Sequence, residues 1–280
     1  MQNSLKILTL VIVIAFFFIG CKQKTQTDNS VPADTIISED NATPAPPTNS
    51  AVKLIKSVEI EQLQNSQTIN HTLQVFYYDE KNRFTKVEEY EYGTEDVRLT
   101  YEFTYKGDFL VYFIDDWSEF TAEKKGNIVH AQDMDNSYTI TLNPDNTMAK
   151  ADIVSEPGPV TSLNEYSYTN GNLVKETKKS ADSHSSGTSV RTYSYDTNHS
   201  PLLNCATDKW FLPHRFSEFG FVNNITKSEW QIDGKPFLTT TSTYEYDADG
   251  YPSKITSITK DHRDSSEETV IRKIEYVGKM

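Results

Sequence analysis

The sequence is poor in cysteine, because Cys21 and Cys205 are the only two in 280 residues. With one pair at most, the chain has no room for a disulfide framework or for a metal site built from several thiolates. If Cys21 is modified, as argued below, Cys205 has no partner within the chain. We expect Cys205 to be a small buried apolar residue, with a catalytic thiol as the alternative.

Positive charge is also scarce. There are 27 Lys and Arg residues against 40 Asp and Glu residues, which gives a formal net charge of −13. Binding to nucleic acid depends on neutralising phosphates with basic side chains, so this balance argues against a nucleic-acid partner. It argues equally against attachment to anionic lipid through a basic face. Any attachment to a membrane therefore needs something other than a basic face.

Long hydrophobic runs are absent except at residues 7–19, where a single Thr interrupts the apolar sequence. This run is too short for a membrane-spanning helix, which needs about 20 residues, and it is typical of a signal peptide over residues 1–20. Phe18-Ile19-Gly20-Cys21 resembles the lipobox of bacterial lipoproteins, in which the cysteine thiol carries the lipid. The resemblance implies lipidation of Cys21 and an anchor in the bacterial outer membrane, facing the periplasm or the cell exterior. An ordinary cleaved signal is the alternative.

Residues 21–52 combine Thr, Ser, Asn, Asp and Pro with almost no aromatic side chain. A segment of this composition cannot bury a core. We interpret it as a disordered tether with a reach of about 30 Å, which joins the lipidated cysteine to a single folded domain, residues 53–280.

From residue 53 onward, most segments alternate apolar and polar residues with period two and are separated by turn residues. The clearest unit is a hairpin in which Tyr244 and Tyr246 share one strand face and Asp247 to Gly250 forms a tight turn. Weaker copies start at Tyr77-Tyr78, Phe103-Thr104-Tyr105, Tyr166-Ser167-Tyr168 and Tyr193-Ser194-Tyr195. The sequence therefore predicts an all-β fold, a long antiparallel meander of about 14 strands in a strongly curved sheet, half-barrel or closed barrel.

One stretch, about residues 197–224, breaks this rhythm. It is rich in aromatic side chains, among them Trp210, Phe211, Phe216 and Phe219. It is too apolar for a solvated loop, so we expect it to pack over the open face or end of the sheet and complete the core. The alternative is that these four residues form a ligand mouth or a surface for a partner, because binding residues often lie in excursions from a rigid scaffold.

The sequence contains no clear catalytic, cofactor-binding or metal-binding site. The best carboxylate pairs for acid and base work on a sugar are Asp115 with Asp116 and Asp133 with Asp135. Asp247-Ala248-Asp249-Gly250 is similar to the start of a calcium loop but lacks the other ligands of an EF-hand, so we interpret it as a turn. The six histidines lack the spacing of zinc ligands, and no glycine-rich phosphate loop is present. We expect no cofactor.

The stretch Tyr244-Glu-Tyr-Asp-Ala-Asp-Gly-Tyr-Pro-Ser-Lys-Ile255 resembles the YD repeat of RHS-type envelope proteins. Together with the lipobox, the tether and Asn223-Asn-Ile-Thr-Lys227, it makes residues 53–280 similar to the uncharacterised Bacteroidetes-type lipoproteins with a porin-like, many-stranded fold. The resemblance implies an envelope lipoprotein and brings no catalytic residue. It does not imply a pore, because the expected strands are short and no outward apolar band with aromatic girdles is visible.

These observations favour a non-enzymatic envelope lipoprotein whose sheet binds a glycan, a peptide or a protein. Tyr and Trp side chains can stack on sugars or anchor a partner. One alternative is a glycan-acting hydrolase that uses the carboxylates named above. The other is a purely structural component of the envelope.

Overall fold

Sixteen strands and one short helix make up the part of the chain that the computed structural model describes, residues 52–115, 118–155, 160–181 and 186–278. All of these residues belong to one unit, Pro47–Met280. The strands are β1 (Lys53–Gln64), β2 (Gln67–Tyr78), β3 (Phe84–Glu91), β4 (Val97–Lys106), β5 (Phe109–Ile114), β6 (Glu119–Lys125), β7 (Ile128–Gln132), β8 (Asn136–Leu142), β9 (Met148–Ser155), β10 (Val160–Thr169), β11 (Asn172–Ala181), β12 (Ser186–Tyr195), β13 (Ile225–Ile232), β14 (Lys235–Tyr246), β15 (Pro252–Asp261) and β16 (Glu267–Gly278), and the helix is α1 (Leu212–Arg215). Within the described ranges, no helix has the length and apolar character needed to cross a membrane.

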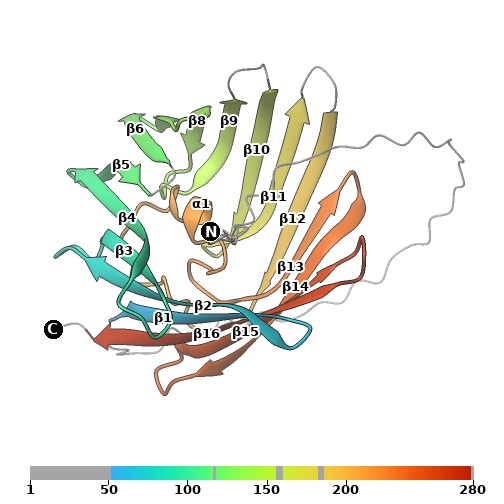
Figure 1. Cartoon of the computed structure of the whole chain (residues 1–280). Coiled ribbons are helices and arrows are strands. Elements are labelled where there is room, and N and C mark those ends of the chain that lie inside the picture. The colour runs from blue at the N-terminus through green and yellow to red at the C-terminus, as the bar shows by residue number, and fades with distance from the viewer. Residues whose placement is uncertain (1–51, 116–117, 156–159, 182–185, 279–280) are drawn as a thin grey trace, which may run out of the picture. The chain divides into compact units, whose positions relative to one another are not determined.

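The strands form one closed antiparallel barrel in which each strand pairs with its neighbours in sequence (Figure 1). The barrel closes between β1 and β16, whose pairing runs from Lys53 with Gly278 to Gln64 with Glu268. Closure removes the free sheet edges that would otherwise invite pairing with other chains. The predicted all-β antiparallel meander is confirmed. It has 16 strands in place of about 14, and of the predicted curved sheet, half-barrel and closed barrel it forms the closed barrel.

The turn at Asp247–Gly250 has the predicted chemistry. The Asp247 Oδ1 atom accepts hydrogen bonds from the backbone N–H groups of Asp249 (2.9 Å) and Tyr251 (3.0 Å), and Gly250 has a φ of +79°. That left-handed conformation favours glycine because it has no Cβ atom. The Lys53 Nζ atom lies 2.7 Å from Asp247 and 2.5 Å from Asp249, so the turn is also joined to the start of β1.

The outer face of the barrel carries many charged side chains, together with some exposed apolar ones such as Val154 and Ile258. Exposed ion pairs join neighbouring strands, for example Lys179 with Glu165 at 3.1 Å and Lys254 with Glu245 at 2.7 Å. Because successive side chains of a strand point to opposite faces, the residues between these charges point into the barrel.

The interior has an apolar half and a polar half. Along β1–β9 the inward side chains pack into one hydrophobic core, which includes Val58, Phe76, Val87, Phe113, Val129 and Ile140. Along β10–β16 many inward side chains are tyrosines, hydroxyl groups or charged groups, such as Tyr166, Arg191, Thr240 and Arg272. Apolar packing therefore fills the half of the barrel formed by β1–β9, whereas the half formed by β10–β16 is largely polar inside.

Residues 196–224, between β12 and β13, form a segment that we call the plug. It contains α1 and lies inside the ring of strands (Figure 1). Its backbone bonds to distant hairpin turns: the Ala206 N–H donates to the Asn82 carbonyl (2.9 Å), and the His199 N–H donates to the Gly250 carbonyl (3.1 Å). These turns join β2 to β3 and β14 to β15, which an up-and-down meander places at the same end of the barrel.

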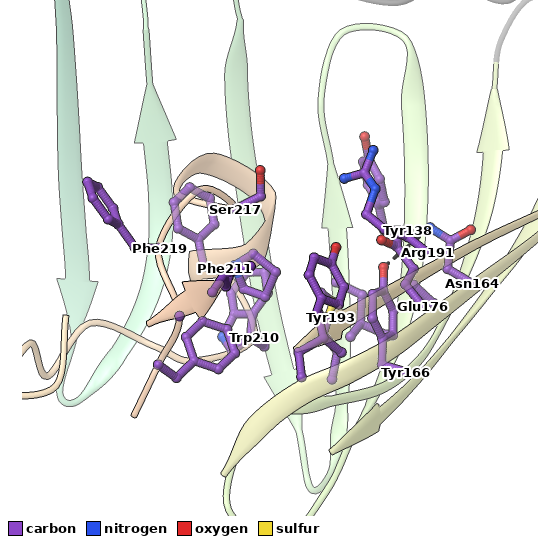
Figure 2. Close-up of a pocket in the computed structure, with 18 of the residues that line it drawn as sticks. Tyr138, Asn164, Tyr166, Glu176, Arg191, Tyr193, Trp210, Phe211, Ser217 and Phe219 are labelled. Carbon is purple, nitrogen blue, oxygen red and sulfur yellow. Dashed lines mark hydrogen bonds between the residues drawn. The ribbon is translucent and has the colours of Figure 1, made fainter. Parts of the chain in front are cut away.

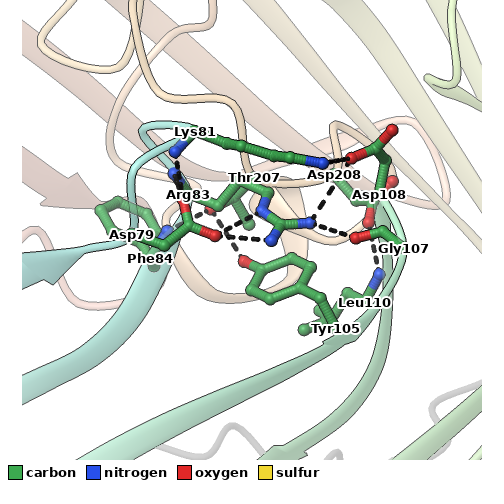
Figure 3. Close-up of polar contacts among 10 residues, drawn as sticks. All are labelled: Asp79, Lys81, Arg83, Phe84, Tyr105, Gly107, Asp108, Leu110, Thr207 and Asp208. Atoms are coloured by element: carbon green, nitrogen blue, oxygen red, sulfur yellow. Dashed lines mark hydrogen bonds and ion pairs between the residues drawn. The ribbon is translucent and has the colours of Figure 1, made fainter.

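Two further plug residues fasten it to β3 and β5 (Figure 3). The Thr207 Oγ1 atom accepts a hydrogen bond from the Phe84 N–H (2.8 Å) and lies 3.2 Å from the Tyr105 hydroxyl. The Asp208 carboxylate accepts from the Leu110 N–H (2.6 Å), and burial raises the pKa of this carboxyl group. The plug thus accepts hydrogen bonds from backbone N–H groups at the beginning of β3 and of β5.

Candidate functional site

A cavity of about 360 Å³ lies between the plug and the inner faces of β6 and β8–β12. We call it the first chamber. Its volume is within the range of about 300–1,000 Å³ that small-molecule sites occupy. Figure 2 shows its two sides, with aromatic residues of the plug facing polar residues of β10–β12. The site is therefore amphipathic.

The aromatic side of the first chamber comes from the residues singled out in the sequence. Trp210, Phe211 and Phe219 line it, with exposed fractions of 2%, 0% and 4%. Phe216 lies elsewhere, in the hydrophobic core, with its ring centroid 5.1 Å from that of Phe84. All four side chains are buried inside the barrel, so they are not on its outer surface. Their role in binding a ligand stays a prediction.

The polar side consists of Asn164, Tyr166, Glu176, Arg191 and Tyr193. Asn164 is 7% exposed and donates a 3.3 Å hydrogen bond from Nδ2 to the Tyr166 hydroxyl. Its Oδ1 atom is buried and has no hydrogen-bond partner among the described residues. A buried acceptor without a partner costs about 1–3 kcal/mol, so such a group in a cavity wall is a candidate contact for a ligand.

Strand register places the charged groups of this wall in one row. Tyr166 pairs with Glu176, Glu176 with Arg191, and Arg191 with Trp230. The Arg191 guanidinium lies 4.7 Å from the centroid of the Trp230 ring, which holds the cation at the edge of the chamber. Glu176 makes no ion pair with any residue in the described part of the chain, although Arg191 is on the adjacent strand. The row offers a ligand a carboxyl group and a guanidinium group that are not paired with each other.

Burial raises the pKa of Glu176 above its ordinary value of 4.5, and this effect outweighs the opposing influence of Arg191 and Lys178. Burial likewise raises the pKa of Tyr166 and of Tyr193. Burial thus disfavours the charged forms of this acid and of these phenols in the chamber.

Replacing Glu176 with glutamine is expected to change how stability depends on pH. Because the folded-state pKa of Glu176 is raised, the stability linked to it is fully present below about pH 4.5 and is lost as pH rises through that pKa. Glu176→Gln should match the wild type near pH 4 and be the more stable protein near pH 8. Urea unfolding at several pH values measures the difference. Glu165→Gln on the outer face is the control for loss of one charge, and a Glu176→Gln effect that does not vary with pH would contradict the argument.

The carboxylate pairs predicted for acid and base chemistry have other contacts and do not line the first chamber. Asp115 contacts Arg215 of the plug and accepts a 2.7 Å hydrogen bond from the Ser118 N–H. Asp133 caps its own turn and accepts a 2.6 Å hydrogen bond from the Tyr138 hydroxyl, while Asp135 is exposed. Asp116 lies outside the described residues.

Of the two cysteines, only Cys205 lies in the described part of the chain. Cys205 is a free, half-buried residue of the plug, and burial raises the pKa of its thiol to about 11. A thiol with a raised pKa is mostly protonated at neutral pH and is a poor nucleophile. Cys21, the predicted lipidation site, lies outside the described residues together with the predicted signal peptide and nearly all of the tether.

Asn164, Glu176 and Arg191 were not singled out from the sequence. Two of them carry a usable signal, because Asn164 and Arg191 stand two residues before the pairs Tyr166-Ser-Tyr168 and Tyr193-Ser-Tyr195. On a strand, residues two apart share a face, so each is expected to point into the barrel with its tyrosines. Glu176 follows no such motif.

No protein-family model matches the sequence, and no curated protein matches it. Among solved structures, the chain is similar to a porin-like protein from Bacteroides uniformis, with 15% sequence identity, a TM-score of 0.37, and coverage of 79% of this chain and 96% of that one. It is also similar to a porin-like protein from Bacteroides vulgatus, with 11% identity, a TM-score of 0.44, and coverage of 81% of this chain and 99% of that one. The architecture described above rests on the strand pairing of this chain itself.

Proposed function

We propose that this protein is a non-enzymatic binding protein of the bacterial envelope that holds a small, hydroxyl-bearing ligand, such as a glycan unit, inside its barrel. The observation that carries the proposal is the first chamber, where buried aromatic rings face a polar wall with an unpartnered Asn164 acceptor. Sites for small molecules combine a mostly apolar lining with a few placed polar groups in this way.

The chemistry of the two sides suits a sugar. The aromatic rings that line the first chamber can pack against the C–H face of a pyranose ring. On the opposite side, Asn164 supplies an acceptor and Arg191 supplies donors, which matches the dual donor and acceptor character of sugar hydroxyls.

A binding measurement tests the proposal. The full chain would be titrated by calorimetry with cellobiose, lactose and chitobiose, and with counterparts whose primary 6-hydroxymethyl group is oxidised to a carboxylate or phosphorylated. Asn164→Leu is expected to weaken binding of any accepted sugar by about tenfold or more, because a buried hydrogen bond is lost. Asn127→Leu, at an exposed turn residue, is the matched control. Absence of binding across the whole panel contradicts the proposal.

We place the protein in the envelope because of its N-terminal sequence. Residues 1–20 have signal-peptide composition and Cys21 follows directly, while the exposed ion pairs on the outer face suit a barrel surrounded by water. A lipid on Cys21 would then anchor a water-exposed barrel through the tether.

Lipidation has its own test. Cells expressing the protein would be grown with a radiolabelled fatty acid, and the label is expected on the wild type and on Cys205→Ser but not on Cys21→Ser. Label retained by Cys21→Ser would show that this cysteine is not the acceptor.

A further inference from the structure

A second cavity, of about 310 Å³, adjoins the first inside the polar half of the barrel. It lies between the inner faces of β12–β16 and residues Ser217 and Glu218 of the plug. The two cavities share Arg191, Tyr193, Ser217 and Ile225 in their linings, so a ligand of two units could extend from one into the other. We call this cavity the second chamber.

Hydroxyl groups dominate the wall of the second chamber. Thr240 and Thr259 are 2.9 Å apart through their Oγ1 atoms, and the Oγ atoms of Ser242 and Ser257 are also 2.9 Å apart. Strand pairing extends this wall to Ser228, opposite Thr240. A hydroxyl group can turn to donate or to accept, so this wall can meet hydroxyl groups on a ligand. It contrasts with the rings of the first chamber.

Arg272, in the lining of the second chamber, has a hydrogen-bond donor that lacks a partner among the described residues. Its Nε atom is buried and has no hydrogen-bond partner among the described residues. It pairs with Ile255 and Ile60 on the two neighbouring strands, so neither strand offers a carboxylate beside it in the ladder. A buried N–H donor of a guanidinium is costly unless something completes its hydrogen bond.

The acidic groups that face this chamber do not neutralise Arg272. Glu268 accepts a 2.8 Å hydrogen bond from the Gln62 side chain. Glu218 makes no ion pair with the described residues, and burial raises the pKa of its carboxyl group despite the opposing influence of Arg272. The other basic side chain in the lining is Arg191. The chamber is thus suited to a group of negative charge.

We propose that the second chamber is an oxyanion subsite, in which Arg272 holds the carboxylate or phosphate of a ligand whose hydroxyl-bearing body extends into the first chamber. The inference rests on the proposed interior binding of a sugar and narrows the ligand to an acidic one. A guanidinium suits either oxyanion because it presents several N–H donors in a fixed fork.

The sugar panel described above tests the subsite when neutral and acidic members are compared. The wild type is expected to bind the carboxylate or the phosphate counterpart at least about tenfold more tightly than the neutral disaccharide. Arg272→Gln, which keeps a hydrogen-bond donor but removes the charge, should abolish this preference. Arg272→Lys should keep part of it. Arg263→Gln, at an exposed arginine of a turn, is the control.

Each outcome separates the two proposals. A preference for the carboxylate assigns a sugar acid as the ligand class, and a preference for the phosphate assigns a sugar phosphate. Equal binding of neutral and acidic members, or a preference that survives Arg272→Gln, overturns the subsite while interior binding stands. Asn164→Leu should weaken neutral and acidic sugars alike. If no member of the panel binds, both proposals fail.

Discussion

Replacing Phe211 with alanine is expected to lower the free energy of unfolding of the barrel by about 3–5 kcal/mol. Phe211 is 0% exposed and is surrounded by rings of the plug and of the strands. Its ring centroid lies 5.0 Å from that of Phe113, 6.0 Å from that of Phe103 and 5.9 Å from that of Phe120. Truncation leaves a cavity that a closed barrel has little freedom to fill, so the loss should lie in this range. Urea unfolding followed by tryptophan fluorescence measures it.

Met134→Ala is the matched control, because this side chain is 77% exposed and its truncation should change stability by less than about 0.5 kcal/mol. A Phe211→Ala protein as stable as the control would mean that the plug contributes little to the folded state. It would also mean that the aromatic side of the first chamber is not rigid.

Replacing Arg215 with methionine is expected to cost about 3 kcal/mol or more. Arg215 contacts Asp115, whose side chain is 4% exposed, and donates a 3.0 Å hydrogen bond to the Ser118 hydroxyl. Its guanidinium also lies 4.8 Å from the centroid of the Phe113 ring. Methionine retains most of the apolar packing but leaves a buried carboxylate without its cation, which is the costly part of breaking such a pair. The pair is a charged link between α1 and the residue that follows β5.

A double-mutant cycle with Asp115→Asn isolates this interaction. The double variant should be less destabilised than the sum of the two single variants, because the second change removes the carboxylate that Arg215 contacts in the wild type. Strict additivity would show that the two side chains do not interact. The claim that this pair stabilises the contact between the plug and the strand end at Asp115 would then be wrong.

The local parts of the fold could be predicted because short-range chemistry determines them. Tyr244, Tyr246 and the turn that follows were predicted as one hairpin, and Asp247 forms the expected turn hydrogen bonds. Strands were missed where neither face is apolar. In β11, Lys175 and Lys179 alternate with Glu176 and Lys178, so period two gives no contrast in hydrophobicity to detect. A polar interior removes the signal on which strand prediction depends.

The sequence could not decide between a closed barrel and an open curved sheet, and it did not predict the two chambers, for a different reason. Closure depends on the register between Lys53 and Gly278, which no local pattern encodes. The aromatic plug was predicted as a distinct segment, but its position inside the barrel depends on bonds to turns such as Asn82 and Gly250. Arg272 in β16 gave no signal, because an arginine within a strand is usually on the solvated face.

The pairing of the first strand with the last has a consequence for how the molecule is made. During synthesis β1 emerges long before β16, so its free edge has no partner until nearly the whole chain has been delivered. The plug meets a similar delay, because His199 needs the Gly250 turn that is formed later. Contacts of such wide sequence separation make folding slow and leave intermediates with open strand edges. We therefore expect the barrel to close only after its final strand has become available.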